Sequence, residues 1–197
     1  MSRVRAVTLV RDARFSLVSS DPAWVFDDKL GARGAAANYT EQQAVDLLDL
    51  PVPRITSANA VHLMWCVDTH LKLGIQLLER WGFAFVGVPF VWSKRTSTGK
   101  CHFGLGRATR KGVELVIMGR RGAGIRRVSA SVRQEIVAPV GRHSEKPQLF
   151  YDRVVALYGD VQRLEMNARI RRPGWHGWGD EIGANDQTLR TVLGPPG

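Results

Sequence analysis

Strand and helix patterns mostly alternate along this chain, and the alternation constrains its fold more than any other feature. Five apolar or alternating runs predict strands, at 15–18, 61–67, 83–92, 113–117 and 161–166. Polar residues at capping positions open three helix patterns, at Thr40, Thr69 and Ser144. Such alternation is typical of a mainly parallel sheet with helices on both of its faces. We therefore expect an α/β fold.

The segments between these patterns predict loops and boundaries. Residues 93–112 and 120–127 are polar or basic and carry glycine, so we expect loops there. Pro89 interrupts the 83–92 run, which predicts a strand that is bent or near a sheet edge. A length of 197 residues suits a single domain over 1–197. We place its core at about 13–183 and expect peripheral termini.

Composition excludes several classes of protein. With 44% hydrophobic and 23% charged residues, the chain is expected to be globular. The sequence contains no apolar run near the ~20 residues of a membrane span, and no secretory signal is evident. Cys66 and Cys101 are its only cysteines and make no disulfide framework, so a cytoplasmic location is expected.

The balance of charge points to a polyanionic partner. Lys and Arg number 28 against 18 Asp and Glu, which gives a formal net charge of +10. A solubilising basic surface would explain the total equally well, but the cations are clustered. One cluster lies in the central stretch, at Arg107, Arg110, Lys111, Arg120, Arg121, Arg126, Arg127 and Arg133. A second lies at 169–172, and this clustering favours nucleic acid.

A tetrapeptide, Asp21-Pro22-Ala23-Trp24, follows the first predicted strand. The amino nitrogen of adenine is a poor nucleophile because its lone pair is delocalised into the ring. A carboxylate and a neighbouring backbone carbonyl can accept its two N–H bonds, and an aromatic face can hold the base by stacking. Taken alone, the same four residues would more often be an ordinary turn beside a core tryptophan.

Three further blocks have the residue types of a cofactor pocket. Lys146 stands in the first turn of a helix pattern, where it can bind a carboxylate or phosphate. Glu165 leaves the last predicted strand, a position from which acids commonly bind ribose hydroxyls. The segment 173–181 alternates glycine with tryptophan, so its backbone could approach a ligand that the indoles cover. Each block alone also fits a plain structural role: a solvated lysine, a surface ion pair, or a loop anchored by tryptophan.

Together, in this order, the four blocks resemble the MT-A family, named after the seventy-kilodalton subunit of messenger-RNA adenosine methyltransferase. The likeness runs from about Phe15 to Ile182 and is strongest to short bacterial and phage members. Four other segments also fit the family pattern, at 63–67, 81–83, 91–94 and 110–114.

The resemblance implies a Rossmann-like methyltransferase that uses S-adenosylmethionine and has a permuted order of motifs. In it, Asp21 would face the adenine amino group and the cofactor, carbonyls around Pro22 and Ala23 would help to hold that amino group, and Trp24 would contact the base. Lys146 would meet the methionine carboxylate. Other residues would border the cofactor: Glu165, Asn167, Arg169, Asp180 and Glu181. An aromatic near the incoming adenosine would be Tyr39.

Phosphate contacts are expected from the basic segments. The candidate residues are Lys94, Arg110, Lys111, Arg120, Arg121, Arg126 and Arg127. The target base would leave the stack or come from a single strand, because its amino group is inaccessible within a duplex. The loops at 31–38 and 94–110 would shape that opening.

The chain departs from the family pattern at three points, which leaves three hypotheses. Ala23 replaces the usual second proline, Asn167 a usual phenylalanine and Asp180 a usual asparagine. The favoured hypothesis is methylation of adenine in DNA, because the chain is compact and carries no appended RNA module. The second is methylation of adenosine in RNA, and the third is an inactive nucleic-acid-binding subunit. The sequence leaves the oligomeric state open.

Two other cofactor types are not expected. The sequence has no Gly-x-Gly-x-x-Gly loop, which weighs against nicotinamide or flavin binding. Its five histidines lack paired ligand spacing, and Cys101-His102 lacks the second cysteine pair of a zinc deaminase. We predict no metal site.

Overall fold

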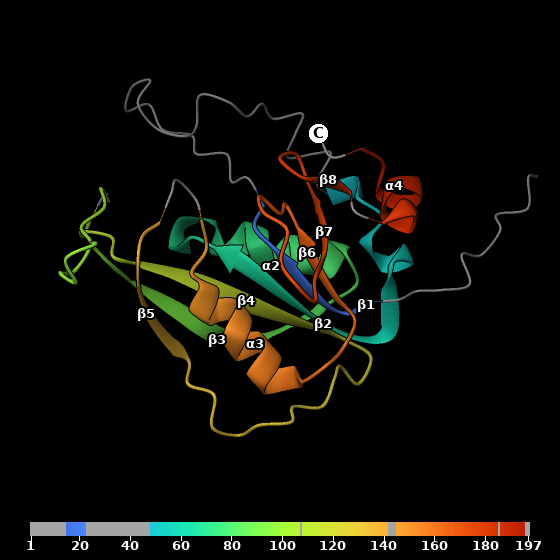
Figure 1. Ribbon diagram of the computed structural model, residues 1–197, viewed down its shortest axis with the longest axis horizontal. Coiled ribbons are helices and arrows are strands. Elements are labelled where there is room, and N and C mark those ends of the chain that lie inside the picture. The colour runs from blue at the N-terminus through green and yellow to red at the C-terminus, as the bar shows by residue number, and fades with distance from the viewer. Residues whose placement is uncertain (1–14, 23–47, 107, 142–144, 185, 196–197) are drawn as a thin grey trace, which may run out of the picture.

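A computed structural model describes residues 15–22, 48–106, 108–141, 145–184 and 186–195 (Figure 1). Within these ranges a single mixed sheet has the strand order β5-β3-β4-β2-β1-β6-β7-β8. The strands are β1 (Phe15–Ser20), β2 (Thr56–Cys66), β3 (Ala84–Arg95), β4 (Val113–Arg121), β5 (Glu135–Pro139), β6 (Arg163–Met166), β7 (His176–Gly179) and β8 (Gly183–Ala184). The helices are α2 (Leu71–Arg80), α3 (Gln148–Tyr158) and α4 (Gln187–Leu193), with 3₁₀ turns η2 (Val52–Arg54) and η3 (Asp68–His70).

Most of these strands run in one direction. β1 lies parallel to both β2 and β6, and β7 continues parallel to β6. β4 runs antiparallel to its neighbours β2 and β3, while β5 is parallel to β3 and β8 is antiparallel to β7. Among the described strands only β4 and β8 are therefore reversed. The expected mainly parallel α/β sheet is confirmed.

Helices cover both faces of the sheet, as expected. The side chains of β2 alternate, so that Met64 and Cys66 pack towards α2 and α4 while Leu63 and Trp65 pack towards α3. Figure 1 shows α3 in front of the sheet and α2 behind it. Burying both faces explains why the central strands read as nearly continuous apolar runs.

Several elements differ from the sequence expectation. β5, β7, β8 and α4 were not expected, and β4 includes Arg120 and Arg121, which we had placed in a loop. The expectation of a peripheral C-terminus is wrong, because Leu189, Val192 and Leu193 of α4 are buried in the core. The bend predicted at Pro89 is present as register shifts between β3 and β4, and β3 lies second from the sheet edge. The helix expected from Thr40 falls mostly outside the described residues.

The arrangement defines where a ligand can bind. β1 is the central strand from which the chain crosses to β2 on one side, while β6 lies on the other side and leads to β7. In open α/β sheets such a switch point leaves a crevice at the carboxyl ends of the strands. Ser20 at the end of β1 pairs with Met64 of β2 and Met166 of β6, so these three ends meet at one edge.

Candidate active site

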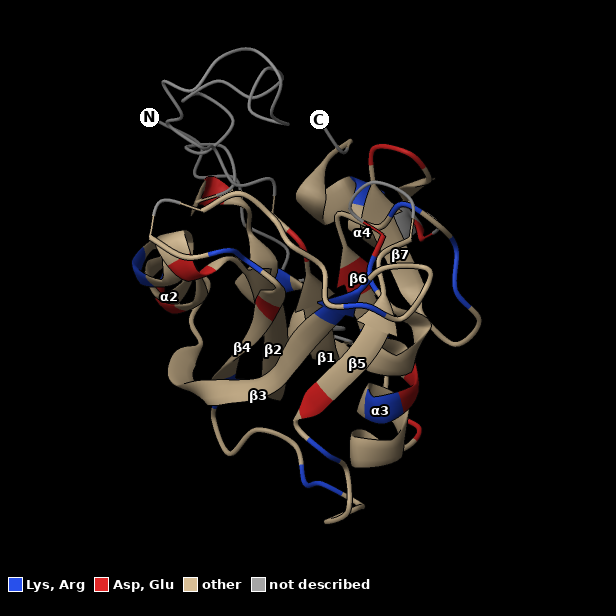
Figure 2. Cartoon of the chain, turned by 90° about the vertical axis from the view of Figure 1, so that its left-hand side faces the viewer, with Lys and Arg blue, Asp and Glu red and all other residues tan. Residues whose placement is uncertain are grey.

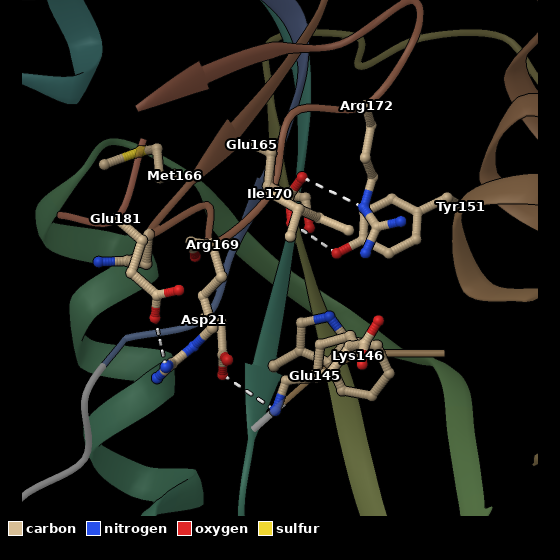
Figure 3. A pocket seen from close by; sticks show the side chains of 14 residues that line it. Asp21, Glu145, Lys146, Tyr151, Glu165, Met166, Arg169, Ile170, Arg172 and Glu181 are labelled. Carbon is tan, nitrogen blue, oxygen red and sulfur yellow. Dashed lines mark hydrogen bonds and ion pairs between the residues drawn. The ribbon is translucent and has the colours of Figure 1, made fainter. Parts of the chain in front are cut away.

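A cavity of about 320 Å³ lies at this edge of the sheet (Figure 3). Its size is typical of small-molecule sites. The lining comes from the ends of β1, β2 and β6, from the segment after β6, from the turn after β7, and from α3 with the segment before it: Ser19, Ser20, Asp21, Trp65, Glu145, Lys146, Tyr151, Glu165, Met166, Asn167, Arg169, Ile170, Arg172 and Glu181. Lys146 precedes the N-cap Pro147 of α3, so it does not lie in the first helical turn as predicted.

Asp21 follows β1 directly and points into the cavity (Figure 3). Its Oδ1 lies 3.1 Å from Nζ of Lys146, and its side chain is 22% exposed. Burial raises the pKa of the Asp21 carboxyl above its ordinary value, and the Glu114 carboxylate adds to this while the Lys146 ammonium opposes it. Asp21 is thus a partly accessible carboxylate held by a lysine, and it keeps contact with the cavity.

Lys146 is the centre of a buried chain of alternating charges. Its ammonium group contacts both Asp21 and Glu114, and the second oxygen of Glu114 lies 2.8 Å from Nζ of Lys94. The Lys146 ammonium also lies 5.0 Å from the centre of the Trp65 ring, within range of a cation–π contact. Burial disfavours the charged lysine, but the two carboxylates outweigh it and raise the pKa of Lys146. For Glu114, burial is likewise outweighed by Lys146 and Lys94, which lower its pKa.

Among these four charged side chains, Glu114 is the one that the sequence did not single out. It lies near the start of β4, and the antiparallel register brings its neighbour Leu115 opposite Cys66 at the end of β2. The amino end of β4 therefore lies at the same edge as the carboxyl end of β2. The only sequence signal was its place in the segment 110–114 that resembles the MT-A pattern.

Glu165, Tyr151 and Arg172 form a second polar group in the cavity. The Tyr151 hydroxyl donates to Glu165 Oε1 at 2.5 Å, and Arg172 Nε lies 3.6 Å from Glu165 Oε2. The Arg172 guanidinium stacks over the Tyr151 ring at 3.7 Å. Burial raises the pKa of Glu165 even though Tyr151 and Arg172 favour its ionised form. This carboxylate therefore lines the cavity, and its Oε2, which is within ion-pair range of Arg172, has no hydrogen-bond partner among the described residues.

Asn167 follows the last residue of β6 in a left-handed backbone conformation, with φ at 61°. A Cβ at Gly179 would lie 2.3 Å from Ala168 O and 2.9 Å from Asn167 C, so only glycine lets β7 pass this segment. Asn167 Oδ1 is buried and has no hydrogen-bond partner among the described residues. Positive φ in a non-glycine residue and an unsatisfied polar atom are features found together at functional sites, so Asn167 remains a candidate for contact with a ligand.

The remaining cofactor candidates are placed around this group. Arg169 and Glu181 line the cavity and pair with each other at 2.7 Å. Asp180 is exposed in the turn after β7, next to the lining residue Glu181 but outside the lining itself, and its role at the cofactor stays a prediction. Pro22 is buried directly after Asp21. Ala23, Trp24 and Tyr39 fall outside the described residues.

The tryptophans of the 173–181 segment do not cover the cavity. Trp175 is buried against Tyr151, with ring centres 5.4 Å apart, and Trp178 is buried with its Nε1 donating to Gly194 O at 3.0 Å. Both indoles anchor the segment on the core. The expectation that they would cover a ligand is wrong, and the plain structural role applies.

The predicted phosphate-binding residues divide between two edges of the sheet. Lys94, Arg110 and Lys111 lie at the end of β3 and before the start of β4, on the cavity side. Arg121 pairs with Ala60 and Arg120 with Val61, near the beginning of β2. Nine residues of β4 separate the two edges by roughly 25 Å at about 3.3 Å per residue. Arg120, Arg121 and the following Arg126 and Arg127 therefore lie far from the cavity edge, so the structure does not bring the expected phosphate contacts together around the site. Figure 2 shows Lys and Arg, in blue, at both ends of the sheet.

Besides Lys94, which pairs with Glu114, two more of these cations have structural partners. Arg121 donates to Pro53 O at 2.9 Å and to Thr56 Oγ1 at 2.6 Å, which ties β4 to η2. Lys111 pairs with Asp68 of η3. Among the described residues, no cluster of three or more His, Cys, Asp or Glu side chains could hold a metal ion. The helices in the described ranges are all too short or too polar to cross a bilayer.

A mainly parallel sheet with helices on both faces and a polar cavity at its switch point defines a Rossmann-like α/β protein. The family model described as MT-A70 matches residues 15–181 of it. The chain belongs to this family of adenine-N(6) methyltransferases.

Individual relatives agree with this assignment. The Type II methyltransferase M.MunI of Mycoplasma sp is 27% identical over 197 aligned residues, which cover 90% of this chain and 82% of that protein. The human N(6)-adenine-specific methyltransferase METTL4 is 26% identical over 85% of this chain, and the N6-methyladenosine RNA methyltransferase MTA1 of Pyricularia oryzae is 25% identical over 92%. The chain spans only 37% and 50% of the lengths of these last two proteins.

Proposed function

We propose that the chain transfers a methyl group from S-adenosylmethionine to the exocyclic amine of adenine in DNA. The observation that carries this proposal is the placement of Asp21: its carboxylate ends the central strand, borders the cavity and is held by Lys146 at 3.1 Å. A carboxylate there can accept an N–H bond of the amine while it remains desolvated enough for that bond to be strong.

The residues of the cavity fit the cofactor. S-adenosylmethionine carries a carboxylate, an ammonium group, a ribose and an adenine, and when bound it supplies an electrophilic methyl carbon on sulfur. Lys146 could hold the carboxylate, and Glu165 and the unsatisfied Asn167 Oδ1 could accept hydrogen bonds from hydroxyl or amino groups. Arg169 and Glu181 border the same space as an ion pair that a ligand could rearrange.

The chain's own part in the reaction is alignment and polarisation. Asp21 must be ionised to accept the amine N–H, and Lys146 fixes the direction in which its oxygens point. Because Glu114 offsets the second positive charge, the group of four charged side chains is neutral overall. Rate enhancement would then come from orientation of the amine, with no covalent enzyme intermediate. The adenine must be extruded or already single-stranded to reach the cavity, because its amino group is inaccessible within a duplex.

The choice of DNA rests on the likeness to the Type II methyltransferase, the match that aligns over most of both chains. RNA is the second candidate, because a relative named as an RNA methyltransferase aligns with 92% of this chain. A cytoplasmic site of action is part of the proposal, supported by two cysteines that remain free.

The test is mass spectrometry of nucleosides from cells that express the chain, comparing wild type with Asp21→Asn. We expect N6-methyladenine in DNA from the wild type and its loss in the variant. Asp49→Asn serves as the control, since Asp49 is an exposed carboxylate in a surface ion pair with Arg80. Calorimetry with S-adenosylmethionine should show that Asp21→Asn remains folded. Full methylation by that variant would refute the proposal, methyl groups in RNA alone would shift it to the second candidate, and a wild type that fails to bind the cofactor would indicate an inactive subunit.

A further inference from the structure

The segment between β3 and β4 forms a defined projection that we call the β3–β4 arm, residues 96–106 and 108–112. Thr96 N donates to Lys100 O at 2.8 Å and His102 N to Lys94 O at 3.1 Å. Gly104 and Lys111 exchange both of their backbone hydrogen bonds, at 2.6 and 3.1 Å. These bonds hold the two sides of the arm together as an extension of the sheet. Figure 1 shows it in light green, projecting beyond β3 and β4.

Close packing of backbone keeps the arm in this shape. A Cβ at Gly106 would lie 2.3 Å from Thr109 O, and one at Gly112 would lie 2.9 Å from His102 O. Substitution at either glycine would push against backbone, which cannot give way as a flexible side chain can. The arm is therefore a built element of the fold, although the sequence predicted a plain loop.

Two contacts anchor the arm beside the cavity. At its C-terminal end Lys111 pairs with Asp68 of η3, directly after the carboxyl end of β2. At its base Lys94 pairs with Glu114, and Glu114 pairs with Lys146 beside Asp21. The arm thus lies on the cavity edge of the sheet and is joined to the proposed active site through two ion pairs.

The arm exposes two large apolar side chains to solvent. Leu105 is 87% exposed and Phe103 is 75% exposed, the highest values among the large hydrophobic residues that the structure describes. Exposure of this degree is costly, and two such side chains grouped on one projection at the cavity edge of the sheet mark an interaction site.

The charge around these side chains identifies the kind of partner. Between residues 96 and 112 the sequence contains four Lys or Arg and no Asp or Glu. Two copies of so cationic an arm would repel each other, whereas a polyanion would be attracted. Apolar side chains set among cations, beside a cavity that must receive an extruded base, are the features of proteins that unstack bases or stack against them.

We propose that Phe103 and Leu105 contact the bases next to the target adenine and keep them from restacking on it while that adenine enters the cavity. This inference deepens the proposed function and rests on it. Phe103 would stack on a neighbouring base, Leu105 would fill the space beside it, and the arm's cations would contact the phosphates on either side.

The test compares binding of a fluorescently labelled, mixed-sequence DNA oligonucleotide by wild type and by the double variant Phe103→Ala, Leu105→Ala. Loss of one stacked base should weaken single-strand binding about tenfold. It should leave the salt dependence unchanged, because no phosphate contact is removed. Arg110→Ala should show the opposite pattern, with the slope of log affinity against log salt reduced by about 1. Phe103→Trp should retain binding, since the larger ring still stacks.

Val128→Ala is the matched control. Val128 is another exposed apolar residue, at 68%, but it lies after β4 at the edge of the sheet opposite the cavity. Equal binding by wild type and the double variant would overturn the inference. So would sedimentation that shows a wild-type dimer which the double variant splits, with DNA binding unchanged, since the arm would then serve self-association. Methyl transfer is scored separately: a wild type that binds DNA through the arm and methylates neither DNA nor RNA would refute the proposed function, while the binding comparison still decides the arm.

Discussion

Replacement of Glu114 by glutamine should destabilise the protein and shift its pH profile at the same time. The substitution keeps the size of the side chain and removes its charge. Lys146 then retains a single carboxylate partner, Asp21 at 3.1 Å, and Lys94 loses its partner at 2.8 Å. Because the Lys146 side chain is only 8% exposed, water cannot replace the missing charge.

The cost follows from this burial. Removing one partner of a buried ion pair typically costs about 3–5 kcal/mol, because the remaining charge stays desolvated. Lys146 keeps Asp21, and the glutamine oxygen can still accept a hydrogen bond, so we expect the lower end, about 3 kcal/mol. For a domain of this size that corresponds to a fall of roughly 6–12 °C in Tm.

The shift in pH profile has a defined direction. The Glu114 carboxylate raises the pKa of Asp21, so its removal should lower that pKa, and the acid limb of methyl transfer should move to lower pH. Glu114 also raises the pKa of Lys146, so loss of the carboxylate should move a basic limb due to this lysine in the same direction. Both limbs should therefore shift towards acid.

The assay combines thermal unfolding with methyl transfer measured across pH, with Glu135→Gln as control. Glu135 is an exposed carboxylate that accepts a hydrogen bond from Ser93 at 2.6 Å, and its replacement should cost less than about 1 kcal/mol. If Glu114→Gln unfolds at the wild-type temperature, Lys146 is not held in a desolvated pair. If the acid limb of the Glu114→Gln pH profile stays at the wild-type pH, then the charge of Glu114 does not affect the pKa of Asp21.

Two further predictions concern residues beneath the cavity. His62 is fully buried, with its Nε2 2.8 Å from Oγ of Ser20, and burial lowers its pKa to about 3. Between pH ~6.5 and about pH 3 the unfolded chain therefore binds a proton at this residue that the folded chain does not bind. The free energy of unfolding should therefore fall as pH falls through this window. In urea unfolding, the fall between pH ~7 and ~5 should be about 2 kcal/mol smaller for His62→Gln than for the wild type. Equal pH dependence of the two proteins would refute the burial of a neutral imidazole. Gly179→Ala should cost about 1–3 kcal/mol and reduce methyl transfer, because its Cβ would press on the backbone that carries Asn167, whereas Gly141→Ala would meet only the flexible Glu145 carboxylate. Equal stabilities of the two alanine variants in the same urea assay would contradict that steric account.

The sequence predicted those elements whose own residues show an apolar pattern that matches their burial. The second half of β2 is a nearly continuous apolar run because helices cover both faces of the sheet there, and α2 shows helical spacing because one face packs on the sheet. β7 reads His-Gly-Trp-Gly, a poor strand by composition, and it becomes a strand because β6 supplies a partner and Gly179 lets the two backbones pass. Short elements that depend on their neighbours in this way carry too little signal of their own.

The same distinction holds at the site. Asp21 and Glu165 could be named because each stands near the end of a strand pattern, and Lys146 because it stands near the start of a helix pattern; the MT-A pattern marks the same positions. Glu114 could not be assigned a role, because its place beside Lys146 depends on the reversal of β4, which no local pattern reveals. Its partner Lys94 was expected to meet phosphate and instead balances this carboxylate at 2.8 Å.

The reversed strand also changes what the net charge of +10 means. In the sequence Arg110 and Arg126 belong to one basic stretch, but β4 runs between them and carries them to opposite edges of the sheet. On the cavity edge Lys94, Lys111 and Lys146 each face a carboxylate, so these three add little net attraction for phosphate where the base must enter. Attraction of the polyanion over long range can come from the whole surface, but these three paired lysines cannot supply the grip on the strand at the cavity. Apolar contacts must therefore add to the phosphate contacts of the arm's other cations. The exposed Phe103 and Leu105 are placed to supply these apolar contacts, and for that reason removal of these two side chains should reduce affinity without changing its dependence on salt.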